Sequence, residues 1–169
     1  LPVVSLRSIS RESQRLVLPL LPVVGNTAAR YYYHERSPEQ EVEDTLRLVL
    51  SRGTRIDPLY RAAAIEMDRA RREMEWNVTS FTDAARSIAV ELRSRKKFSR
   101  LLHQISQPTL LIHGTEDRVV PVASALWAAE QRPDWKFELI ENMGHTPQIE
   151  DPEMFTEMVE DWLGASAIR

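Results

Sequence analysis

The chain has 169 residues, a formal net charge of −3 and 43% hydrophobic residues, which is typical of a globular domain rather than a disordered chain. It has no cysteine, which excludes disulfides, thiolate metal sites and a cysteine nucleophile, and we expect a cytoplasmic protein. The longest apolar stretch, residues 16–24, contains two prolines and is far shorter than the roughly 20 residues that span a bilayer. We therefore expect no membrane span.

The two ends of the chain differ in charge. Residues 1–60 carry a net charge of +1, residues 61–100 carry +4 and residues 101–169 carry −8. The basic cluster at residues 93–100 could contact phosphates, but cations near the end of a helix also stabilise its dipole. We therefore expect no nucleic-acid partner.

Four helices are predicted in the first two thirds of the chain. Ser37-Pro-Glu-Gln40 has a capping serine, a proline at the first helical position and a glutamine three residues after the cap, and we expect Gly53 to end this helix. Asp57-Pro58 opens a second helix in the same manner, a third begins at Thr79 or Ser80, and a short fourth covers residues 98–105. Each of the first three has an apolar stripe at helical spacing: Val42, Leu46, Val49 and Leu50; Leu59, Ala63, Met67, Ala70 and Met74; and Phe81, Ala84, Ala85, Ile88 and Leu92.

After Pro108 the pattern changes from helical to alternating strand and helix. Residues 109–112 form a continuous apolar run, as expected of a strand in a parallel sheet. A helix at 122–131, a strand at 136–141 and a last helix after Asp151-Pro152 complete a β-α-β-α unit. Two parallel strands cannot bury their own faces, so other strands must be supplied. We divide the chain into a helical segment, 1–105, and an α/β segment, 106–169.

Two titratable residues follow the two predicted strands. Asp117 ends the run His113-Gly-Thr-Glu-Asp, and His145 follows Gly144. An imidazole can take a proton from a nucleophile and return it to a leaving group, while a carboxylate fixes its tautomer. The structural alternatives are a loop histidine and a carboxylate that caps a turn or helix, and Glu116 competes with Asp117 as the acid. No G-x-S-x-G motif for a nucleophile occurs in these 169 residues.

The α/β segment strongly resembles the C-terminal end of the α/β-hydrolase family. The resemblance covers residues 108–121, 135–141, Gly144-His145 and Asp151-Pro152. It implies an α/β fold, the C-terminal part of an α/β-hydrolase fold with two late parallel strands and flanking helices, preceded by a mostly helical cap at 1–105. It also implies that Asp117 is the acid of a triad and His145 the general base, since Asp117 holds the family position and Glu116 does not.

This resemblance implies a hydrolase, esterase-like when intact. The chain alone lacks the nucleophile and the oxyanion hole, and we expect it to be an inactive fragment. Serine or aspartate could be the nucleophile, so epoxide hydrolase, dehalogenase and C–C hydrolase chemistries remain alternatives. A different class of protein, a non-catalytic module that binds a ligand or partner, is the second hypothesis.

Five residues of the helical segment are candidates for lining an apolar substrate pocket, although ordinary packing would also explain each of them: Tyr31, Tyr32, Tyr33, Met67 and Trp76. His34 and His103 have no second ligand at metal-binding spacing, and we predict no metal and no cofactor. The expected partners are a small apolar substrate, the missing N-terminal half of the same protein and a second copy of the chain through self-association.

Overall fold

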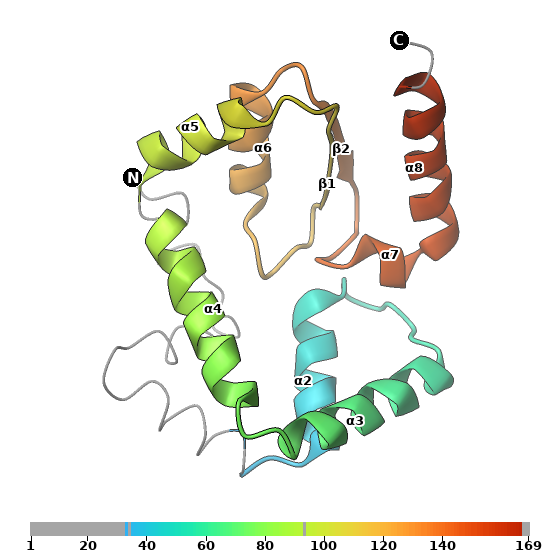
Figure 1. The fold of residues 1–169 in the computed structure, drawn as a ribbon. Coiled ribbons are helices and arrows are strands. Elements are labelled where there is room, and N and C mark those ends of the chain that lie inside the picture. Colours follow the sequence, from blue (N-terminus) through green and yellow to red (C-terminus); the bar gives the residue numbers. More distant parts are fainter. Residues whose placement is uncertain (1–32, 34, 93, 167–169) are drawn as a thin grey trace.

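The computed structural model describes residues 33, 35–92 and 94–166. In chain order it contains α2 (Pro38–Val49), α3 (Pro58–Arg72), α4 (Asn77–Leu92), α5 (Arg95–Gln104), β1 (Leu110–Gly114), α6 (Val122–Gln131), β2 (Lys136–Ile140), α7 (Pro147–Glu150) and α8 (Pro152–Ser166) (Figure 1). Within these residues, no helix combines the length and the hydropathy needed to cross a membrane.

The two strands pair in parallel, with Leu110 opposite Lys136 and Gly114 opposite Ile140. Helix α6 connects them, and Figure 1 shows α6 and α8 on opposite sides of the pair. Strand β1 is only partly buried until its last two residues, and Leu139 of β2 is 36% exposed. The sheet formed by the described residues therefore leaves apolar strand surface in contact with solvent.

Helix α2 carries the hydrophobic core of the helical segment. Its capping box forms as predicted, because the Ser37 side chain accepts from the Gln40 N–H and the Gln40 side chain accepts from the Ser37 N–H. Three of its predicted apolar residues, Val42, Leu46 and Leu50, are buried together. Partly buried hydrophobic residues pack around this core cluster: Val49, Ile56, Ala64, Ile65 and Ile149. The last of these lies on α7, so the core cluster joins α2 to the α/β segment.

The predicted helices are all present, but several boundaries differ. Helix α2 ends at Val49 instead of near Gly53, because Leu50 already has an extended backbone with ψ of 153°. Helix α4 starts at Asn77, ahead of the predicted Thr79 or Ser80. The Thr79 hydroxyl donates back to the Trp76 carbonyl at 2.9 Å, so it does not cap the N–H groups that follow.

Helix α5 begins inside the basic cluster at residues 93–100. Helix α5 starts at Arg95 rather than residue 98, because Ser94 caps it by accepting from the Lys97 N–H at 3.3 Å. Strand β1 begins one residue later than predicted and continues through His113 and Gly114, while β2 ends one residue earlier than predicted. The predicted cap at Asp151 is present, since its carboxylate accepts from the Met154 N–H at 3.0 Å.

Most of the described residues in the apolar stripes predicted for α3 and α4 face solvent. In α3, Leu59 is 79% exposed and Met67 is 50% exposed, while its buried residue is Asp68. In α4, Phe81 and Ile88 are 53% and 59% exposed. The spacing of these residues correctly indicated helices. The described residues, however, cover other sides of α3 and α4 than the predicted apolar stripes.

Candidate functional site

The site lies where the loops after β1 and β2 meet. The Thr115 N–H donates to the Ile140 carbonyl at 2.9 Å, and the Glu116 N–H donates to the Met143 carbonyl at 2.8 Å. The loops must approach closely here, because a Cβ on Gly114 would lie 2.2 Å from the Met143 carbonyl oxygen. The parallel register thus brings the ends of both strands, and the residues that follow them, to the same edge of the sheet.

Asp117 and His145 contact each other across these two loops. His145 Nδ1 lies 2.8 Å from Asp117 Oδ2. The other carboxylate oxygen, Oδ1, accepts from the backbone N–H groups of Val119 at 2.7 Å and Val120 at 2.8 Å. The Asp117 side chain is 3% exposed, while that of His145 is 37% exposed. The Asp117 carboxylate is therefore buried and accepts hydrogen bonds on both oxygens, while the imidazole of His145 reaches solvent.

This pairing shifts both titrations. Burial of the Asp117 carboxyl opposes its ionisation, but hydrogen bonds from His145, Val120 and Val119 outweigh burial and lower the pKa of Asp117. The hydrogen bond to Asp117 raises the pKa of His145 and outweighs the partial burial of the imidazole, which acts in the opposite direction. The site is thus a carboxylate that stabilises a protonated imidazole, the electrostatic arrangement that a His general base requires.

Glu116 and His113, the neighbouring titratable residues, make different contacts. Glu116 Oε2 accepts from the Arg52 N–H at 2.9 Å, so this carboxylate is turned towards the end of α2. His113 is buried at the end of β1, with Nε2 3.1 Å from the Val120 carbonyl oxygen and 3.6 Å from Asp117 Oδ2. Of the two acids considered from the sequence, Asp117 is the one in hydrogen-bond contact with His145.

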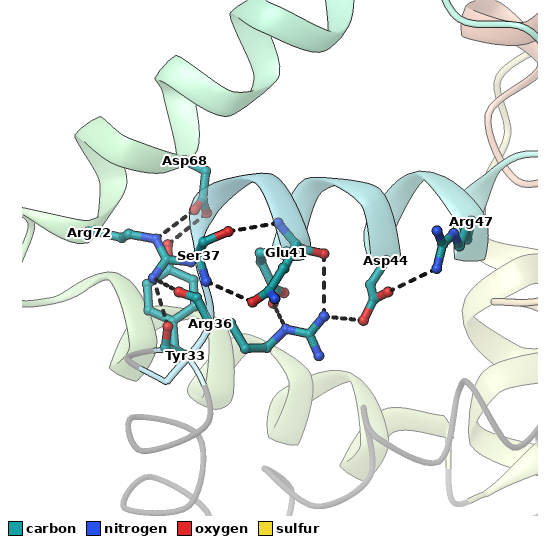
Figure 2. A network of polar contacts seen from close by, with 9 residues as sticks. Tyr33, Arg36, Ser37, Glu41, Asp44, Arg47, Asp68 and Arg72 are labelled. Carbon is teal, nitrogen blue, oxygen red and sulfur yellow. Dashed lines mark hydrogen bonds and ion pairs between the residues drawn. The ribbon is translucent and has the colours of Figure 1, made fainter.

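Three of the five candidate substrate-binding residues, Tyr33, Met67 and Trp76, are among the described residues, and these three do not gather at this site. Tyr31 and Tyr32 lie outside the described residues. Tyr33 lies at the opposite end of α2, where its hydroxyl donates to Asp68 at 2.9 Å (Figure 2). Met67 and Trp76 are 50% and 61% exposed on the helical segment.

Tyr33 belongs to a polar network at the N-terminal end of α2 (Figure 2). Its hydroxyl also accepts from Asn77 Nδ2 at 3.0 Å, and the Arg72 guanidinium lies 4.3 Å from its ring centroid. Arg72 Nε donates to Asp68 at 2.7 Å. Burial, followed by the hydrogen bond to Asp68, raises the pKa of Tyr33. These contacts tie the chain before α2 to α3, which is a structural role for Tyr33.

Two features of the site were not predicted from the sequence. The backbone N–H groups of Val119 and Val120 fix Asp117, and the Glu150 carboxylate contacts the loop that carries His145 through the Gly144 N–H at 2.8 Å. Glu150 ends a four-residue helix, α7, which the sequence analysis did not predict. Its signal was the proline in Thr146-Pro147, since proline favours the first position of a helix.

The sequence model for the alpha/beta hydrolase fold matches residues 6–152 of the chain. The chain belongs to the α/β-hydrolase family. This family assignment and the predicted fold class are confirmed, and the structure shows the part of that fold with two parallel strands and flanking helices.

Relatives within the family include esterases and C–C bond hydrolases. A pimeloyl-[acyl-carrier protein] methyl ester esterase from Aromatoleum aromaticum is 32% identical over 50% of this chain. A 2-hydroxymuconate semialdehyde hydrolase from Pseudomonas putida is 36% identical over 37% of this chain. The chain spans 34% and 22% of the lengths of these two relatives.

Solved structures of the family share the fold of the chain. An esterase from Thermogutta terrifontis has a TM-score of 0.60 and 23% identity, covering 92% of this chain and 51% of that esterase. A serine hydrolase involved in carbazole degradation has a TM-score of 0.56 and 21% identity, covering 75% of this chain and 47% of that hydrolase. Each of these matches accounts for most of this chain but about half of the known protein.

Proposed function

We propose that Asp117 and His145 are the acid and the general base of a nucleophile–His–Asp triad that hydrolyses an ester or a related bond. The observation that carries this proposal is the 2.8 Å contact between His145 Nδ1 and the buried Asp117 carboxylate. Because Asp117 engages Nδ1, the other ring nitrogen, Nε2, can take a proton from a nucleophile and return it to the leaving group.

In this proposal the nucleophile and the oxyanion hole come from sequence outside these 169 residues. None of the five glycines lies in a G-x-S-x-G motif, which in this fold precedes the acid in chain order and supplies part of the oxyanion hole. The chain covers 51% of the Thermogutta terrifontis esterase, which leaves room for these parts in a longer protein. The 169 residues alone would then be inactive.

We assign the helical segment as the cap of this longer protein. Its exposed apolar side chains support this role, because Met67 and Trp76 are available to a substrate or to a hydrolase core placed against them. The substrate would be a small, largely apolar molecule. Ester hydrolysis is our first candidate reaction and C–C bond hydrolysis the second, since esterases and C–C bond hydrolases both match this chain.

Kinetics of a longer protein that includes the upstream coding sequence test the proposal. Asp117→Asn and His145→Ala should each lower kcat for nitrophenyl esters by several orders of magnitude, about 10⁴-fold for loss of a triad acid. Glu116→Gln is the matched control and should have a mild effect, since Glu116 contacts Arg52 and not His145. Circular dichroism should show that all three variants are folded.

Two results would contradict the proposal. One is a severe loss in Glu116→Gln with an unaffected Asp117→Asn. The other is saturable ester turnover by the isolated chain that His145→Ala abolishes. An upstream sequence with no nucleophile motif would favour a ligand- or partner-binding module instead.

A further inference from the structure

Glu150 joins the loop that carries His145 to the end of α2. One carboxylate oxygen, Oε1, accepts from the Gly144 N–H at 2.8 Å. The other, Oε2, accepts from the Ser51 N–H at 2.9 Å and from the Thr54 hydroxyl at 2.8 Å. Three donors from two segments that are far apart in the sequence therefore converge on one side chain.

The backbone of His145 is held at the same place. Its N–H donates to the carbonyl of Val49, the last residue of α2, at 2.6 Å. Gly144 is packed so tightly that a Cβ there would lie 2.6 Å from Glu150 Oε1, from the Ser51 nitrogen and from the Val49 oxygen. The histidine loop thus has no room to shift at Gly144 without breaking these contacts.

The same end of α2 also contacts the loop that carries the acid. The Arg52 N–H donates to Glu116, and Arg118 donates to the Leu50 carbonyl. We call residues 49–54 the α2 junction. Glu116 and Arg118, which flank Asp117, therefore both contact the α2 junction directly. His145 contacts it through Val49, and Gly144 is linked to it through Glu150.

We propose that Glu150 is a positioning residue, which holds His145 in hydrogen-bond contact with Asp117 by fastening the histidine loop to the α2 junction. The inference rests on the proposed function only for its effect on catalysis. Hydrogen bonds to an ionised carboxylate are stronger than neutral ones, and a site of this kind works only when its groups are held within about 0.5 Å of the productive geometry. Because the α2 junction belongs to the helical segment, Glu150 also makes the position of His145 depend on that segment.

The first test needs no catalytic activity. In the 169-residue chain with ¹³C at the histidine Cε1 atoms, Glu150→Ala should lower the pKa of His145, since the contact with Asp117 that raises it is loosened. Hydrogen exchange of the Gly144 N–H should become roughly tenfold faster, because its acceptor is gone. Glu153→Ala removes the same charge from the exposed start of α8 and should change neither.

Glu150→Gln separates position from charge. It is also neutral but keeps an amide oxygen that can accept, so both readouts should lie between wild type and Glu150→Ala. Equal changes of the His145 pKa in both variants, with the Gly144 N–H still protected, would show a charge effect alone and overturn the inference. If Glu150→Ala does not fold, Glu150→Gln decides: exchange as slow as in wild type at both Gly144 and Ser51 would also overturn it.

The second test uses the longer protein. Glu150→Ala should lower kcat with little change in KM, and Glu150→Gln should restore part of the loss. If the longer protein lacks hydrolase activity but the His145 pKa still responds, the proposed function fails and the positioning role stands. If the protein is active and neither kcat nor the His145 pKa responds, the positioning role fails and the proposed function stands.

Discussion

At the scale of single residues, the carboxylate of Asp117 is fixed on both of its oxygens. Oδ1 is held by two backbone N–H groups, so Oδ2 points at the imidazole of His145. A carboxylate held in this way cannot rotate to leave the imidazole without giving up hydrogen bonds in a place that water hardly reaches, which costs more than losing the same bonds at a surface. The direction of the pair is therefore built into the loop after β1.

The pH dependence follows from the two pKa directions. The raised pKa of His145 means that its contribution to stability is fully present below the unfolded value of about 6.5 and is lost as the pH rises through the folded value. The lowered pKa of Asp117 means that its contribution is present above about 3.8 and is lost as the pH falls through the folded value. We expect the pair to stabilise the chain most between these limits, at mildly acidic pH.

An NMR titration of His145 checks this expectation. The pKa of His145 should lie above 6.5 in the wild-type chain and should fall in Asp117→Asn, because the neutral amide does not stabilise the imidazolium. In the longer protein, the neutral base form would then appear at lower pH, and the acidic limb of the residual kcat profile should move to lower pH in this variant. An unchanged His145 pKa in Asp117→Asn would show that the observed contact does not persist in solution.

Gly144 provides a steric test of the site. A Cβ there would lie 2.6 Å from the backbone atoms of Ser51 and Val49, and backbone atoms cannot move away easily. We expect Gly144→Ala to destabilise the chain by about 1–3 kcal/mol, the usual cost of overpacking. Gly164→Ala in α8 is the matched control, because nothing lies within 4 Å of its Cβ position and alanine is the better helix former by about 1 kcal/mol. Urea unfolding measures both, and equal stabilities of the two variants would contradict the packing at Gly144.

The sequence allowed the pair of residues at the site to be predicted, but not what holds them. Asp117 and His145 each follow a strand, and parallel strands bring the residues after them to one edge, so their proximity could be inferred from order alone. The contact of Glu150 with Ser51 spans 99 positions. It depends on how the helical segment packs against the α/β segment, and no local pattern specifies that packing.

At the scale of elements, α2 connects the two segments of the chain. Its N-terminal end is fixed by the polar network around Tyr33 (Figure 2), and its C-terminal end contacts both site loops. The stability of α2 therefore affects how firmly the two site loops are held, although no residue of α2 takes part in the proposed chemistry.

Ser37→Ala tests the contribution of the cap of α2. The variant removes the acceptor for the Gln40 N–H at 3.2 Å, and we expect it to lower the free energy of unfolding by about 1 kcal/mol, the usual cost of losing a capping serine. Ser87→Ala is the control, since Ser87 is exposed in the middle of α4 and alanine favours a helix there. Thermal melting compares the two, and an unchanged melting temperature for Ser37→Ala would mean that the capping box contributes nothing.

Helical periodicity predicted the elements better than it predicted their environment. In α2 the apolar stripe and the core coincide, because α3 and α7 cover this stripe. In α3 the apolar stripe faces outward, Ala64 and Ile65 pack against the core cluster of α2, and the buried residue is Asp68. Periodicity shows that one side of a helix is apolar, but the burial of that side depends on what packs against it, which for α3 and α4 is not found among the described residues.

At the scale of the whole molecule, the described residues form a sheet of two strands. Parallel strands normally lie in larger sheets that are covered on both faces, and the solved esterase that the chain matches is about twice as long. The half-buried strands and the outward stripes of α3 and α4 then have the same cause. Apolar surface that these residues do not cover is present on both segments.

We therefore expect the isolated chain to self-associate or to bind the upstream part proposed above. Leaving apolar surface in water costs about 25 cal/mol per Å², and an open strand edge offers unpaired N–H and carbonyl groups to another chain. Light scattering on the purified 169 residues, with other polypeptides excluded by mass spectrometry, should give a mass above the 19.5 kDa of one chain. Adding the upstream part proposed above should convert these assemblies into a one-to-one complex, because in the proposed longer protein it would cover the same strands. A monodisperse monomer that melts cooperatively would mean that the helical segment protects the strands unaided, and the exposed stripes would then need a different explanation.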